Sequence, residues 1–141
     1  MKELFMVRAD ALNEALAGYL KSKNIVKLPE NFDIIKTSHG KQRAPSDKDW
    51  YYKRAASIFR KLLIAMHEEK RIGVKRLSRK YGCAKNRGSR PSKHVDGSRG
   101  HIRKIMQDLE RAGLIVKDGN YRKVSDMGII ETGQLISQIK E

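Results

Sequence analysis

Apolar residues recur with a helical period over several stretches of this 141-residue chain. The longest such stretch begins near residues 45–47 and ends near His67. At about 100° per residue, one arc of this helix collects the apolar side chains. The pattern therefore predicts a central helix with one face in the core. The members of that face are Tyr51, Ala55, Ile58, Phe59, Leu62 and Met66.

The same spacing predicts further helices before and after the central one. Residues 114–124 indicate a β-hairpin instead, because two short runs with β-propensity flank an Asp-Gly-Asn turn. Residues 82–97 show no hydrophobic period, and we expect them to form a loop. The core positions of the first helix are Leu12, Ala15, Leu16, Tyr19 and Leu20, and those of the helix after residue 98 are Ile102, Ile105, Met106 and Leu109. Val74, Leu77 and Tyr81 share one face of a short helix, and the final helix carries Ile129, Ile130, Leu135, Ile136 and Ile139.

Short helix, connector, helix, hairpin and helix is the element order of a winged helix. We predict a mainly α fold: a single helical domain with a winged-helix half, made of a helix–loop–helix plus one β-hairpin wing. The chain has no internal repeat, low-complexity tract or domain linker, so residues 1–141 are expected to form one domain. A chain of this length buries roughly two thirds of its unfolded surface in a single core.

The charge balance is strongly basic, with 31 Lys and Arg against 16 Asp and Glu, a formal net charge of +15. Such a chain is expected to bind a polyanion, and nucleic acid is favoured over a membrane. No apolar run approaches the ~20 residues that a membrane span needs, and the first residues lack the apolar core of a signal peptide. We expect a soluble intracellular protein. Its single cysteine, Cys83, excludes an internal disulfide.

Polar and basic residues share the arc of the central helix that lies opposite the apolar face. Few acidic residues are interleaved with them, whereas an ordinary solvated face mixes both signs. Trp50 also falls on this arc, and two interpretations are open. It stacks or wedges beside cations that contact phosphate, or it packs under a loop formed by residues 23–43. The contact interpretation is preferred.

The predicted loop carries four cations and His94 against a single acidic residue, Asp96. Because Val95 is its only large aliphatic residue, we expect the loop to be mobile in the free protein and ordered on a phosphate backbone. The basic segment 39–43 is also expected near the partner. Together with two cations of the next helix, the predicted RNA-binding residues are Trp50, Lys53, Arg54, Ser57, Arg60, Lys61, Lys85, Arg87, Arg90, Lys93, Arg99 and Arg103.

Catalysis fits the sequence poorly. The histidines His39, His67, His94 and His101 have none of the spacings that bind metals or activate a nucleophile. Paired carboxylates for general acid and base chemistry are not apparent either. We therefore expect no enzymatic activity, no metal, no cofactor and no small-molecule substrate.

Motifs spread in order over most of the chain resemble the small-subunit ribosomal protein family nineteen-e, which eukaryotes and archaea share. Its central-helix pattern is similar to Ala44-Pro45, then Asp49-Trp50-Tyr51-Tyr52, then Arg54-Ala55-Ala56-Ser57-Ile58. The later matches are Tyr81-Gly82, Asn86-Arg87-Gly88, Pro91 with His94, Gly97-Ser98, and Arg103 with Gln107-x-Leu109-Glu110-x-x-Gly113-Leu114. Cys83 and Met106 depart from the family pattern, and neither is a charged position.

The resemblance implies a structural constituent of the small ribosomal subunit that binds folded rRNA and neighbouring small-subunit proteins. It also implies a place in the subunit head and a role in subunit assembly and pre-rRNA maturation. The ribosome is cytoplasmic, and in a eukaryote assembly is nucleolar. The alternative is a winged-helix DNA-binding transcriptional regulator, which normally brings a dimerisation helix or an effector pocket. Neither is visible in the sequence.

Overall fold

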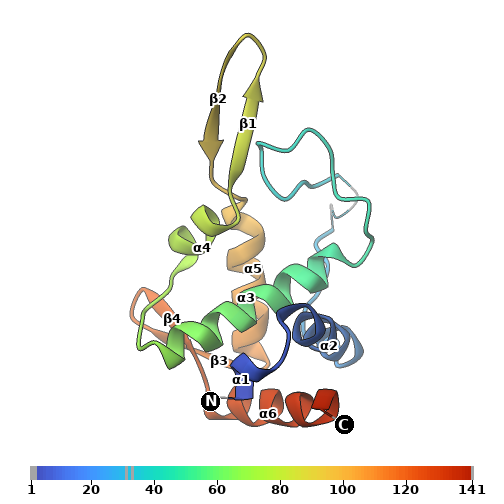
Figure 1. The fold of residues 1–141 in the computed structure, drawn as a ribbon, viewed down its shortest axis with the longest axis vertical. Helices are drawn as coiled ribbons and strands as arrows, with labels where there is room; N and C mark the ends of the chain where they lie inside the picture. Colours follow the sequence, from blue (N-terminus) through green and yellow to red (C-terminus); the bar gives the residue numbers. More distant parts are fainter. Residues whose placement is uncertain (1–2, 31, 33, 141) are drawn as a thin grey trace.

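The structure is a computed structural model that describes residues 3–30, 32 and 34–140. Over these residues the chain forms six helices and two antiparallel hairpins (Figure 1), which confirms the mainly α class. The helices are α1 (Glu3–Met6), α2 (Ala9–Ser22), α3 (Trp50–His67), α4 (Val74–Lys80), α5 (Arg99–Arg111) and α6 (Asp126–Lys140). The strands are β1 (Cys83–Arg87), β2 (Arg90–Val95), β3 (Ile115–Asp118) and β4 (Tyr121–Val124).

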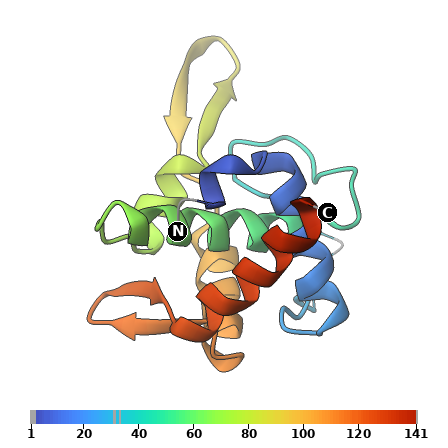
Figure 2. The same ribbon diagram turned by 60° about the horizontal axis from the view of Figure 1, so that its bottom comes forward.

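Helix α3 runs through the centre of the fold, and α6 crosses the base of the molecule in Figure 1, which Figure 2 brings to the front. Tyr51, Ile58 and Leu62 of the predicted apolar arc are almost completely buried. Ala56 and Leu63, which lie outside that arc, are buried too, because α2 packs along this second side of α3. Each buried Leu or Ile side chain of α3 stabilises the fold by about 1.5–3 kcal/mol relative to an exposed one.

The predicted wing is confirmed as the β3–β4 hairpin, which pairs Asp118 with Tyr121 at its tip. Gly119 in the turn has a φ of +61°, a left-handed conformation that glycine adopts without strain. The side chain of Arg122 forms an ion pair with Glu110 of α5. Its backbone N–H also donates to the carbonyl of Ile72 at 3.5 Å, so the wing is tied both to α5 and to the connection between α3 and α4.

The expectation of a loop over residues 82–97 is wrong. Strands β1 and β2 form a second hairpin that projects from the helical body (Figure 1). The turn is closed by the Gly88 N–H, which donates to Asn86 Oδ1 at 2.9 Å, and Gly88 has a φ of +74°. Most side chains on both faces of this hairpin are exposed. Such strands need no apolar face and therefore show no alternation in the sequence.

The described part of the 23–49 segment has no regular secondary structure, but it is held against the winged-helix half. Ser38 Oγ donates to the Asp96 carbonyl at 2.9 Å, and the Ser98 N–H donates to the Thr37 carbonyl at 3.0 Å. These bonds fix the segment beside the base of the β1–β2 hairpin and the first turn of α5.

Candidate nucleic-acid interface

Three polar residues of α3 converge on Tyr81, the residue that follows α4. The Arg54 guanidinium carbon lies 4.0 Å from the centroid of the Tyr81 ring, and Lys61 Nζ lies 4.9 Å from it. Ser57 Oγ and the Tyr81 hydroxyl share a hydrogen bond of 2.6 Å. A cation over an aromatic ring is attracted by the negative ring face. Tyr81 therefore holds two cations side by side at the border between α3 and α4.

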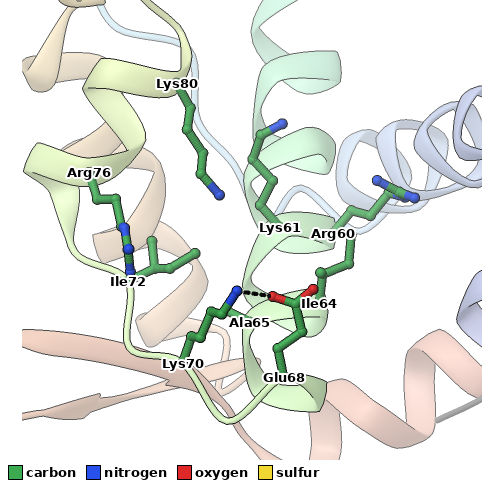
Figure 3. Close-up of a pocket in the computed structure, with 9 residues that line it drawn as sticks. All are labelled: Arg60, Lys61, Ile64, Ala65, Glu68, Lys70, Ile72, Arg76 and Lys80. Atoms are coloured by element: carbon green, nitrogen blue, oxygen red, sulfur yellow. Dashed lines mark ion pairs between the residues drawn. The ribbon is translucent and has the colours of Figure 1, made fainter.

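A groove of about 570 Å³ runs between α3 and α4 next to this cluster (Figure 3). Its floor is apolar, and the amines of Lys61 and Lys80 extend into it from opposite walls. Burial first, and then neighbouring cations led by Lys80, lower the pKa of Lys61. Among the described residues that line the groove, Glu68 is the acidic one, and it is paired with Lys70 at 3.0 Å. The full lining is Arg60, Lys61, Ile64, Ala65, Glu68, Lys70, Ile72, Arg76 and Lys80.

Arg60 contributes to the groove with its aliphatic stem, whereas its guanidinium turns away from Lys61 and Lys80 (Figure 3). Its Nε atom is buried and has no hydrogen-bond partner within residues 3–30, 32 and 34–140. Arg54 and Lys61 therefore lie together as predicted, while Arg60 projects from a different side of α3.

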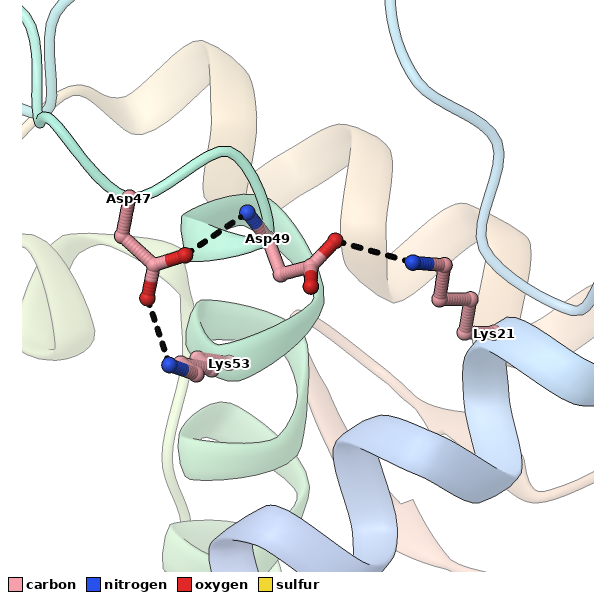
Figure 4. A network of polar contacts seen from close by, with 4 residues as sticks. All are labelled: Lys21, Asp47, Asp49 and Lys53. Atoms are coloured by element: carbon pink, nitrogen blue, oxygen red, sulfur yellow. Dashed lines mark hydrogen bonds and ion pairs between the residues drawn. The ribbon is translucent and has the colours of Figure 1, made fainter.

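Lys53 lies on the exposed side of α3, but it is not a free cation. It forms an ion pair with Asp47, whose other carboxylate oxygen accepts the Asp49 N–H at 2.9 Å (Figure 4). Asp49 in turn pairs with Lys21 of α2 at 3.0 Å. The hydrogen bond from Lys53 lowers the pKa of Asp47. The expected lack of acidic neighbours is thus wrong at Lys53, because the segment before α3 folds back and supplies them.

Trp50 does not stand on an exposed face. It is 8% exposed, and its ring stacks on Phe32 with centroids 5.8 Å apart and planes at 13°. The His101 ring meets it edge-on at 5.5 Å. The preferred interpretation, in which Trp50 contacts RNA, is therefore corrected: the segment before α3 covers the ring. Aromatic pairs of this kind stabilise a core by about 0.5–1.5 kcal/mol beyond burial.

Four predicted binding residues belong to the β1–β2 hairpin, where they form two cross-strand pairs of like charge. Lys85 lies opposite Lys93, and Arg87 lies opposite Arg90, with an irregularity in the ladder between Lys85 and Arg87. Like charges directly opposite each other destabilise a hairpin. Arg87 Nε donates to the Pro91 carbonyl at 2.7 Å, which holds that side chain along the turn.

A second basic groove of about 460 Å³ separates the β1–β2 hairpin from residues 36–42. Lys85 lines it from the hairpin, and Lys36 and Lys41 line it from the opposite side. A Cβ added to Gly40 would lie 2.6 Å from Val95 Cγ2, so the backbone of the segment lies directly against the base of the hairpin. The expectation that the basic segment 39–43 reaches the partner remains a prediction.

The two predicted residues of α5 are exposed. Arg99 forms a weak pair with Asp96 at 3.4 Å, and Arg103 lies one turn further along the helix. The predicted residues thus fall on α3, on the hairpin and on the start of α5. Sequence reasoning omitted several cations that line the two grooves, although the basic face of α4 was a signal for two of them. The omitted residues are Lys36, Lys70, Arg76 and Lys80, whereas Lys41 belongs to the segment 39–43 that was expected near the partner.

Within the described part of the chain, no group of three or more His, Cys, Asp and Glu side chains is placed to hold a metal ion. Helices long and apolar enough to cross a membrane are also absent from these residues. Cys83 is a free thiol, partly buried at the start of β1.

Comparison with known proteins identifies the family of this chain. The Ribosomal protein S19e family matches residues 3–141. Small ribosomal subunit protein eS19B of Schizosaccharomyces pombe is 42% identical over 86% of this chain and 83% of its own length. Protein eS19A of Saccharomyces cerevisiae is 36% identical over 96% of this chain and 92% of its own. Protein eS19A of Drosophila melanogaster is 37% identical over 92% of this chain and 81% of its own. The chain therefore belongs to the S19e family of small-subunit ribosomal proteins, a structural class of the ribosome.

Proposed function

We propose that this structural constituent of the small ribosomal subunit binds folded rRNA by electrostatic clamping. The observation that carries the proposal is the α3–α4 groove, which Lys61 lines from α3 and Lys80 lines from α4, and in which the nearby carboxylate of Glu68 is already paired. Cations held close together without counter-charges are stabilised when an anion lies between them. A phosphate in the groove supplies that charge.

Each basic element has a distinct part in the clamp. On the Tyr81 ring, Arg54 and Lys61 are oriented before binding, so less side-chain freedom is lost when they contact phosphates. The β1–β2 hairpin reaches RNA from a second side with Lys85, Arg87, Arg90 and Lys93. A bound RNA phosphate backbone offsets the repulsion between the opposed cations of the hairpin, and its own condensed counterions are released.

Helix α5 contributes Arg99 and Arg103 at the base of the hairpin. In a winged-helix regulator this helix would enter a DNA major groove. The major groove of A-form RNA is too deep and narrow for side chains to read, so these arginines contact phosphates and 2′-hydroxyls. Trp50, being buried, takes no part in the clamp.

The finer assignments rest on the family resemblance alone. We propose that the protein lies in the head of the subunit beside other small-subunit proteins and supports subunit assembly and pre-rRNA maturation. It acts on cytoplasmic ribosomes and, if the source is a eukaryote, also in the nucleolus.

The proposal is tested by the affinity of the free protein for a folded small-subunit rRNA fragment at increasing salt. Log affinity should fall linearly with log salt, and Lys61→Met should reduce the slope by about 0.9, the value for one contact to a double-stranded phosphate. Lys140→Met, which removes one charge at the far end of α6, is the matched control and should leave the slope unchanged. Duplex DNA of equal charge should compete poorly. Equal competition by duplex DNA would favour the DNA-binding regulator. An unchanged slope for Lys61→Met would show that the groove does not bind phosphate.

A further inference from the structure

A third basic hollow lies beside α4, between that helix and the wing. It has a volume of about 330 Å³. Lys75 and Arg79 line it from α4, and Arg71 lines it from the connection that precedes the helix. None of these three cations belongs to the α3–α4 groove, and only Arg76 lines both hollows. No acidic residue of the described chain is among its lining residues.

Tyr121 is the aromatic residue of this hollow, and it is 40% exposed at the start of β4. The ring rests on the backbone at Gly73, where an added Cβ would lie 3.6 Å from the ring carbon Cδ1. The next residue, Arg122, is fixed by its bond to Ile72 and its ion pair with Glu110. The ring is thus held in place by its surroundings while a large part of it stays open to solvent.

The Arg71 guanidinium carbon lies 6.0 Å from the centroid of the Tyr121 ring. The corresponding distance from Arg54 to Tyr81 is 4.0 Å, which is close contact. The longer distance leaves the Tyr121 ring without a tightly packed cation. Arg71 is itself tied to α4, because Arg76 donates to its carbonyl at 3.3 Å.

An exposed aromatic ring surrounded by cations is the arrangement that binds an unpaired nucleotide. The base stacks on the ring, and the flanking phosphates contact lysine and arginine. We propose that Tyr121 stacks on an unpaired base of a single-stranded RNA segment, whose phosphates bind Lys75 and Arg79. Since the nucleic acid is taken to be RNA, the proposal rests on the function proposed above. The proposal adds a second RNA segment, so that α4 would lie between the folded rRNA in the α3–α4 groove and the single-stranded segment on Tyr121.

The probe is a short single-stranded oligoribonucleotide with an internal 2-aminopurine, whose fluorescence is quenched when it stacks on an aromatic ring. The wild-type protein and Tyr121→Phe should both quench it. Tyr121→Ala should lose the quenching and bind about tenfold more weakly, as expected for one lost stacking contact. Equal quenching and affinity for Tyr121→Ala would overturn the proposal. Because Tyr121 is exposed, the variant should fold, which a thermal melt verifies.

The charged part of the site is tested separately. Arg79→Met should reduce the salt slope for the oligonucleotide by about 0.7, whereas Lys140→Met should not. The oligonucleotide should also bind protein that is already saturated with the folded rRNA fragment, and Arg54→Glu should weaken only the rRNA complex. Displacement of the oligonucleotide by the fragment would overturn the second site. Failure of the fragment itself to bind would instead refute the proposed function.

Discussion

The Arg54 guanidinium lies over the Tyr81 ring at 4.0 Å, so the charge of α3 is positioned by a residue that follows α4. Tyr81 is half-buried, and its hydroxyl shares a hydrogen bond with Ser57, which belongs to α3 like Arg54. The orientation of the cations on α3 therefore depends on the packing of α4.

Replacing Tyr81 should separate the contribution of its ring from that of its hydroxyl. Tyr81→Phe removes the Ser57 bond and should cost about 0.5–1.5 kcal/mol of unfolding free energy, with rRNA affinity retained. Tyr81→Leu also removes the ring face that orients Arg54 and Lys61, and should weaken rRNA binding clearly more than Tyr81→Phe. Urea unfolding and rRNA titration measure the two effects. Equal rRNA affinity for both variants would show that the ring does not position the cations.

A second prediction concerns pH and His101. Burial, which outweighs the opposing hydrogen bond from ring Nε2 to the Lys36 carbonyl, lowers the pKa of His101 below 6.5. The unfolded chain then binds the proton first as pH falls. The contribution of His101 to stability should be complete above pH 6.5 and be lost as pH falls through the lower folded-state pKa.

The measurement is the free energy of unfolding in urea between pH 7.5 and pH 5, in steps of about half a unit. His101→Gln cannot titrate and should flatten this pH dependence, even though it also removes ring contacts with Trp50. An identical slope in the variant would assign the pH dependence to other groups.

Two glycines of α6 should respond oppositely to alanine. A Cβ on Gly128 would lie 2.5 Å from the Leu114 carbonyl and 2.7 Å from Val124, so Gly128→Ala should destabilise the fold by about 1–3 kcal/mol. Gly133 has nothing within 4 Å, and Gly133→Ala should stabilise by about 0.4–1 kcal/mol. Thermal melts of the two variants give the comparison. Stabilisation by Gly128→Ala would mean that α6 can move away from the wing.

The β1–β2 hairpin should show a conflict between stability and binding. Lys93→Glu places an opposite charge across from Lys85 and should stabilise the hairpin by about 0.2–1 kcal/mol, seen as slower amide exchange. The same change should weaken rRNA binding by more than the neutral control Lys93→Gln. Faster exchange in the glutamate variant would show that the two lysines do not repel each other in the free protein.

Periodicity predicted the core of α3 well, because the positions of Tyr51, Ile58 and Leu62 depend only on helix geometry. It misplaced Trp50 for an equally physical reason. The ring projects from the polar arc of α3, and it is buried by Phe32 and His101, which come from elsewhere in the chain. No pattern within one helix can predict such cover.

The candidate site was predicted less completely than the core. Lys53 could be assigned to the exposed arc of α3, but its pairing with Asp47 depends on how the preceding segment folds back. The β1–β2 hairpin was missed because its strands bury little, which left the Asn86-Arg87-Gly88 turn as the main local signal. The α3–α4 groove exists only once Lys61 and Lys80 are brought together by packing.

The projecting β1–β2 hairpin also determines where a protease can reach the free protein. Its exposed tip presents the Arg87–Gly88 peptide bond next to Ser89, and exposed loop tips of this kind are preferred sites of proteolysis. RNA bound as proposed would cover this bond, whereas the free protein leaves it open to trypsin-like cleavage. If RNA binds the hairpin as proposed, trypsin should therefore cut the free protein at this tip faster than it cuts the protein in its RNA complex.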